Sequence, residues 1–98
     1  MSDYKNMLLT ACVNGDIGIV ENCISKGVDV NAMGRYGWNT ALILASHFGN
    51  LEIVVTLLES GADTNAKDIN KQTARDNALS QHEFKIVEIL DKWEAKNG

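Results

Sequence analysis

Residues 39–66 read NTALILASHFGNLEIVVTLLESGADTNA, and they predict two short helices. A short apolar helix is predicted to start at Ala41 and to end at Gly49, because glycine readily adopts the left-handed conformation that closes a helix. A second helix is predicted from Leu51 to Ser60, which Gly61 ends in turn. Its apolar residues recur on one helical face, at Ile53, Val54, Leu57 and Leu58.

The same pattern recurs on both sides of this stretch. Residues 15–20 align with 49–54, and residues 27–32 align with 61–66, both at an offset of 34. A third copy follows at an offset of 33, so we expect one extra residue between Gly34 and Asn39. Helices this short are marginal alone, and each copy must cover its neighbour's apolar face. The period therefore predicts a stacked solenoid.

The quoted stretch closely resembles the ankyrin repeat, whose pattern reads T-P-L-H-x-A-A-x-x-G-H-x-x-I-V-x-L-L-L-x-x-G-A-D-V-N-A. The resemblance covers nearly the whole chain as three units, about 4–33, 34–66 and 67–98, within a single domain of residues 1–98. It implies an all-α solenoid of three stacked helix-turn-helix units with short β-hairpin-like fingers.

The chain departs from the family pattern in two ways. It has no proline, and Ala41 stands where the family has one. The family histidine is replaced by Leu9, Ile43 and Asp76. Apolar contact must therefore carry more of the stacking than the family's usual hydrogen bonds between repeats.

The outer units have the character of caps. In the third unit Arg75 stands at the position of Leu42, and Asp91 stands at the position of Leu58. Polar groups thus replace core groups where no fourth unit would cover them, as solubility of a solenoid requires. We expect Trp93 to fold against the end of the stack, and the three units to form a complete array.

Composition narrows the class of partner and the location. Nine Lys and Arg face thirteen Asp and Glu, a formal net charge of −4, without a basic run. Such a chain is a poor ligand for nucleic acid or for an anionic membrane. It shows no signal sequence or membrane span, so we expect a cytoplasmic protein. Cys12 and Cys23 are expected to be buried free thiols, the alternative being a disulfide or metal pair.

We find no constellation that predicts catalysis, a cofactor or a metal site. The two histidines, His47 and His82, have no third ligand nearby in the pattern and are expected at surface or turn positions. His82 replaces the glycine that ends the preceding helix in the other units, so we expect it to close that helix. No nucleophile motif or phosphate loop is present. The prediction is a non-enzymatic protein.

The ankyrin resemblance implies where a partner protein would bind, because family members use the finger tips and the exposed face of each first helix. The residues at these positions include aromatic side chains and an arginine, which are residue types enriched at interface hot spots. Local packing of Tyr36, Trp38 and Phe48 is the competing interpretation. Carried over by position, the predicted binding residues are Arg35, Tyr36, Trp38, Asn39, His47, Phe48, Ile69, Asn70, Gln72, Ser80 and Gln81.

The sequence thus predicts a protein–protein interaction module, either a small adaptor or an inhibitor that occludes its partner. The alternative is a structural protein that forms a homodimer through its exposed aromatic residues, instead of remaining a monomer.

Overall fold

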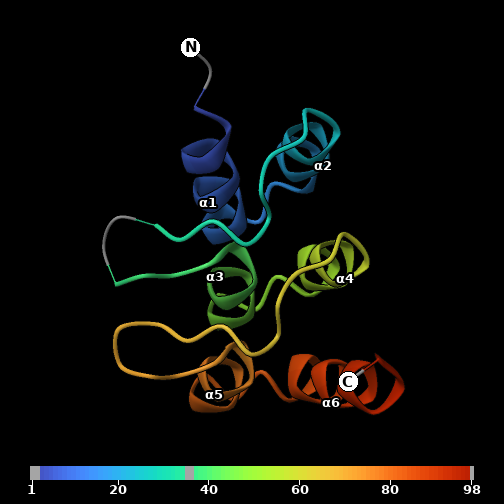
Figure 1. The fold of residues 1–98 in the computed structure, drawn as a ribbon. Helices are drawn as coiled ribbons and strands as arrows, with labels where there is room; N and C mark the ends of the chain where they lie inside the picture. The colour runs from blue at the N-terminus through green and yellow to red at the C-terminus, as the bar shows by residue number, and fades with distance from the viewer. Residues whose placement is uncertain (1–2, 35–36, 98) are drawn as a thin grey trace.

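Three helix pairs stack on one another in the computed structural model, which describes residues 3–34 and 37–97. Helices α1, α3 and α5 form one column, and α2, α4 and α6 form a second (Figure 1). Within the described residues there is no β-strand, and the predicted all-α repeat solenoid is confirmed. The helices are α1 (Tyr4–Asn14), α2 (Ile17–Ser25), α3 (Ala41–His47), α4 (Leu51–Glu59), α5 (Ala74–Ser80) and α6 (Phe84–Asn97).

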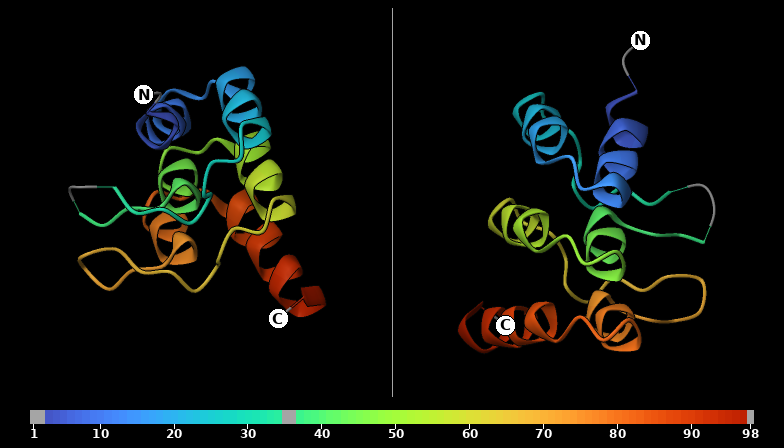
Figure 2. Two further views of the ribbon diagram at one scale, coloured as in Figure 1. Left: turned by 45° about the horizontal axis from the view of Figure 1, so that its top comes forward. Right: turned by 180° about the vertical axis from the view of Figure 1, so that it is seen from behind.

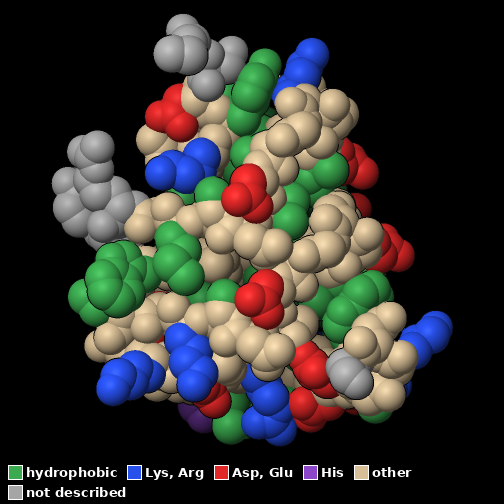
Figure 3. Space-filling model, viewed as in Figure 1, with side chains coloured by type: hydrophobic (Ala, Val, Ile, Leu, Met, Phe, Trp, Pro, Cys, Tyr) green, Lys and Arg blue, Asp and Glu red, His purple; other side chains and the backbone are tan. Residues whose placement is uncertain are grey.

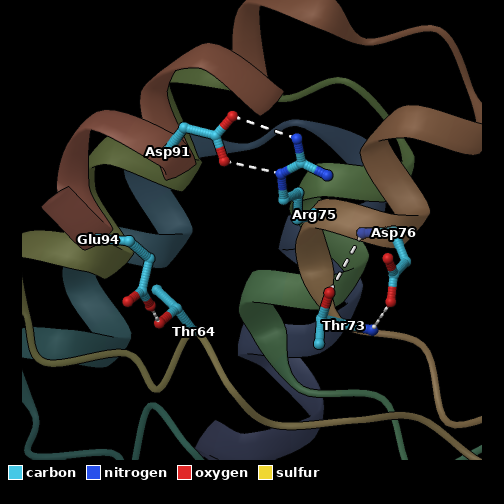
Figure 4. Close-up of polar contacts among 6 residues, drawn as sticks. All are labelled: Thr64, Thr73, Arg75, Asp76, Asp91 and Glu94. Carbon is cyan, nitrogen blue, oxygen red and sulfur yellow. Dashed lines mark hydrogen bonds and ion pairs between the residues drawn. The ribbon is translucent and has the colours of Figure 1, made fainter. Parts of the chain in front are cut away.

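Side-chain caps start the first helix of each pair. The Asp3 carboxylate accepts a hydrogen bond from the Asn6 amide, and the Thr40 hydroxyl accepts one from the Ile43 amide. In the third pair Thr73 and Asp76 form a reciprocal capping box, visible in Figure 4. Each cap satisfies an amide that the helix itself leaves without a partner.

The turn between the two helices of each pair has a left-handed residue at the same position. Gly15 and Gly49 have φ angles of 80° and 75°, and His82 has a φ of 60° in the third pair. The expectation that His82 closes its helix in place of glycine is therefore confirmed. In this conformation the histidine Cβ is crowded by the backbone, whereas glycine has no Cβ.

The core lies between the two columns and between successive pairs. Ile53, Val54, Leu57 and Leu58, the predicted apolar face, are all at most 2% exposed. Ile43, at the family histidine position, is also buried. Cys12 and Cys23 are free and buried, as expected, and burial raises the pKa of Cys12 to about 12, with Cys23 adding to the effect.

Hydrogen bonds also join successive pairs, and two of the residues involved, Asn31 and Asp63, stand at the N and D positions of the G-A-D-V-N-A motif. The Asn50 side chain donates to the Cys12 carbonyl at 2.6 Å. In the loops, the Asn31 side chain donates to the Gly61 carbonyl and accepts from the Asp63 amide at 2.7 Å. Stacking is therefore largely apolar but carries specific polar links that set the register between repeats.

The fingers project from one side of the stack, as the two further views in Figure 2 show. The second finger is closed by a bond from the Gly34 amide to the Asn39 carbonyl, and the third by a bond from Asp68 to Gln72. The second finger thus spans one residue more, which accounts for the change of offset. In their described residues the fingers are turns without paired strands, so their likeness to β-hairpins is partial.

Polar side chains end the stack at the third pair. Arg75 and Asp91, which replace the leucines of the second pair, form an ion pair at 2.7 Å (Figure 4). The Thr64 hydroxyl donates to Glu94 beside them. Trp93 packs partly buried against the core, as expected.

Candidate protein-binding face

A hollow of about 280 Å³ opens between the fingers and the first-column helices α3 and α5. The second and third fingers meet there, because the Ile69 amide donates to the Gly37 carbonyl at 2.9 Å. The residues that line the hollow are Gly37, Asn39, Leu44, His47, Phe48, Asp68, Ile69, Asn70 and Asn77.

The buried Asp68 carboxylate organises the third finger. It accepts hydrogen bonds from the Asn70 and Gln72 amides, at 2.9 and 3.0 Å, and from the Asn77 side chain at 3.2 Å. Burial alone would raise the pKa of Asp68, but these bonds, and the nearby His47, outweigh burial and hold its pKa below the usual value. The finger is thereby held to α5 in one conformation.

Asn77 links Asp68 to His47 on α3 through its side chain. Its amide nitrogen donates to Asp68 and to the Thr73 carbonyl, so its oxygen faces the His47 Nδ1 at 3.1 Å. Because that oxygen can only accept, Nδ1 of His47 must carry the proton. In the neutral ring Nε2 is then an acceptor, and the imidazole orientation is set by the network.

Large apolar side chains in the hollow and on the adjoining second finger remain exposed. Trp38, Phe48 and Ile69 are 56%, 50% and 58% exposed. The Phe48 ring makes an edge contact with His47, with centroids 4.8 Å apart. In Figure 3 hydrophobic side chains gather over the fingers. Local packing therefore leaves about half of the Trp38 and Phe48 surfaces uncovered.

The predicted binding residues fall into three groups. Five of them line the hollow together: Asn39, His47, Phe48, Ile69 and Asn70. Four lie outside its lining: Trp38 and Gln72 on the fingers, Ser80 at the end of α5, and Gln81 just after it. Arg35 and Tyr36 lie outside the described residues.

The hollow also contains residues that the sequence analysis left out. Asp68 and Asn77 hold its polar network, and Gly37 and Leu44 complete its lining. The sequence carries no clear signal for Asn77, because its counterparts in the first and second repeats are Thr10 and Leu44, and the family pattern leaves this position open.

The described residues show no group of three or more His, Cys, Asp or Glu side chains that could hold a metal ion. Within the same residues, no helix has the length and apolar character needed to cross a membrane.

The family model and the similar proteins both indicate ankyrin repeats. The model of ankyrin repeats in three copies matches residues 2–68. The chain is 41% identical, over 90 residues, to an ankyrin repeat, SAM and basic leucine zipper domain-containing protein 1 from Carollia perspicillata. The proteins of the same name from Atelerix albiventris and Ovis aries are 36% and 34% identical over 91 and 90 residues. Each match covers 90% of this chain but 18% of the relative.

Proposed function

We propose, because the chain belongs to the ankyrin-repeat family, that it binds a partner protein through the hollow between its fingers and helices α3 and α5. Ankyrin repeats are generally protein–protein interaction modules. The observation that carries the proposal is an exposed rim beside an ordered polar floor: Phe48 and Ile69 line the hollow, and Trp38 is exposed on the second finger next to Gly37 and Asn39. Aromatic anchors around fixed polar groups are typical of interface hot spots.

The partner is a protein rather than a nucleic acid or a membrane. The described lining residues include no Lys or Arg, and the chain carries a formal net charge of −4. Phosphate groups would find little to neutralise them there. With no catalytic constellation in the sequence, such binding would make the protein a small adaptor or an inhibitor that covers its partner's surface.

A cytoplasmic location is part of the same proposal. Cys12 and Cys23 support it because both are free thiols, buried as small apolar residues. Reducing compartments favour unpaired cysteines of this kind. Localisation of a tagged chain in its native cell would test this directly.

The main test is partner capture with variants of the exposed rim. Trp38→Ala and Phe48→Ala should each weaken capture of the same partner by about tenfold or more, because each removes a large contact area. Circular dichroism and thermal melting should show an unchanged fold. Phe84→Ala is the matched control, since Phe84 is 60% exposed but begins α6 in the second column and belongs neither to a finger nor to the hollow's lining. Equal capture by folded wild-type protein and rim variants would refute the proposed face.

Self-association through the same exposed rim is the second candidate. The exposed surfaces of Trp38, Phe48 and Ile69 favour it, because apolar patches of this kind also pair between identical subunits. Light scattering across a concentration series separates the two. A monomer at high micromolar concentration excludes the homodimer and leaves the binding module.

A further inference from the structure

A second hollow, of about 350 Å³, lies on the first helix pair, at the end of the stack opposite α5 and α6. It runs along one face of α1 and reaches the first turn of α2. Its centre is apolar and its edges are polar. The lining residues are Asp3, Asn6, Met7, Thr10, Ala11, Asn14, Asp16 and Ile19.

The repeat shows that this surface is one that helices pack upon. Ile53 and Ile86 occupy the same repeat position as Ile19, and they are 2% and 1% exposed under the preceding helix pair. Ile19 itself is 39% exposed, because no described helix covers it. The hollow is therefore an uncovered version of a helix-packing surface that is filled twice inside the same molecule.

The surface nevertheless differs from the two internal junctions. Ala41 and Ala74 are fully covered there, whereas the first repeat carries the larger, half-exposed Met7 at that position. A repeat stacked at the internal spacing would meet this side chain. Asn50 reaches across its junction to a carbonyl, but its counterpart Asp16 instead accepts from the Ile19 amide of its own helix. A carboxylate cannot donate to a carbonyl as Asn50 does.

The opposite end of a second copy is also a poor occupant. It would bring the Arg75–Asp91 ion pair, now half exposed to water, against Met7 and Ile19. Burying that pair against apolar groups removes its hydration without new partners. Two copies that met through this same end would place one hollow against the other, and neither hollow would be filled.

We propose that this hollow binds one amphipathic α-helix of another protein, apolar on the face that enters and flanked by Lys or Arg. Charge complementarity supports the basic flank, because Asp3 and Asp16 lie on the rim and no Lys or Arg is among the lining residues. Helices commonly bind in apolar grooves through side chains at i, i+3, i+4 and i+7. Met7 suits this role because an unbranched thioether adapts to irregular surfaces.

The test is a titration of the full ¹⁵N-labelled chain with a synthetic amphipathic peptide of about 18 residues, long enough to form a helix. The probe has leucines along one helical face and lysines on both sides of it. Its matched control has glutamate in place of every lysine. We expect saturable shifts in the amides of α1 and the start of α2, with the amides around the finger hollow unmoved. The glutamate peptide should bind several-fold more weakly.

Variants then separate the apolar centre from the acidic rim. Ile19→Ser should weaken binding of the lysine peptide by about tenfold, because serine lacks most of the apolar surface that Ile19 offers to the peptide. Asp3→Asn and Asp16→Asn should each weaken it by about two- to fivefold, while asparagine still caps the helix. Phe84→Ser is the matched surface control and should change nothing. Melting curves check that every variant folds.

Three outcomes would overturn the proposal. The first is an absence of saturable shifts in α1 and α2 up to millimolar peptide. The second is equal binding of the lysine and glutamate peptides, which would remove the basic flank. The third is a concentration-dependent shift of the same amides without peptide, which would make a second copy the occupant. Partner capture through the finger hollow can succeed or fail independently of all three.

Discussion

The two ends of the stack, where no further helix pair covers the core, expose different kinds of surface. At the C-terminal pair, Arg75 and Asp91 replace the buried Leu42 and Leu58, and they pair with each other at the surface. At the N-terminal pair, Ile19 keeps the apolar character of Ile53 and Ile86 but loses their cover. One end therefore presents charge to water, and the other presents an apolar hollow.

The burial of a side chain in this stack depends on the neighbouring helix pair and not on its repeat position. Ile19, Ile53 and Ile86 are the same residue type in the same helical context, yet only the two with a preceding helix pair are buried. In a solenoid each unit contacts only its neighbours. A residue in an end unit can therefore be exposed although the same residue is buried in the other units.

The largest expected effect comes from truncating the same residue at two positions. Ile53→Ala should lower the free energy of unfolding by about 2–4 kcal/mol, because it leaves a cavity in a closed junction. Ile19→Ala should cost less than about 1 kcal/mol, since its side chain is already part-hydrated. Urea unfolding followed by circular dichroism measures both. Equal costs would show that the first pair is as closed as the junctions.

The next largest effect concerns the turn of the C-terminal pair. His82→Gly should stabilise the protein by up to about 1 kcal/mol, because His82 holds a φ of 60° that glycine adopts without steric cost. Gly49→Ala is the reverse experiment in the second pair. It should destabilise by roughly 1 kcal/mol, since alanine is strained at the φ of 75° that Gly49 holds, whereas the Glu83 carboxylate near the added carbon can turn away. Opposite signs are required; two destabilising changes would contradict the account.

A smaller effect on folding, with a visible effect on association, is expected at the C-terminal cap. The double variant Arg75→Leu, Asp91→Leu gives the third pair the residues of the second. A surface ion pair contributes only about 0–1 kcal/mol, so the unfolding free energy should barely change. The new apolar end should cause association that rises with concentration in sedimentation velocity. A monomer under all conditions would show that the cap is dispensable for solubility.

The smallest effect is a titration shift. The hydrogen bond and charge of Arg75 hold the pKa of Asp91 below its usual value. This group therefore contributes stability above its unfolded-state pKa, and the contribution is lost as pH falls through the lower folded-state pKa. Arg75→Leu should raise the pKa of Asp91, which carboxyl NMR titration measures. An unchanged pKa would show that the pair does not persist in solution.

Much of the fold follows from local patterns. The helix pairs, the left-handed turns at Gly49 and His82, and the extra residue of the second finger are all visible in a single sequence compared with itself. These features depend on residues close in the chain, where propensity and spacing act directly. The binding hollow was predicted only in outline, since five of its lining residues were named and four were not.

The remaining features depend on residues far apart in the chain. The pattern marked Arg75 and Asp91 as polar caps, but that they bond each other follows from how α5 packs on α6. Likewise Asp68 looks like an ordinary turn residue until Asn77 and His47 are brought beside it. Pairing of this kind is set by the distance between elements, which a repeat pattern does not contain.

The repeat pattern is sufficient to predict short amphipathic helices that recur and must stack, because none can bury its apolar face alone. Which apolar side chains remain exposed at the ends, and which polar groups meet beside the fingers, follows from how the helix pairs pack in three dimensions. The physical reason is that helical periodicity is a local property, whereas burial is a property of the neighbour that each helix receives.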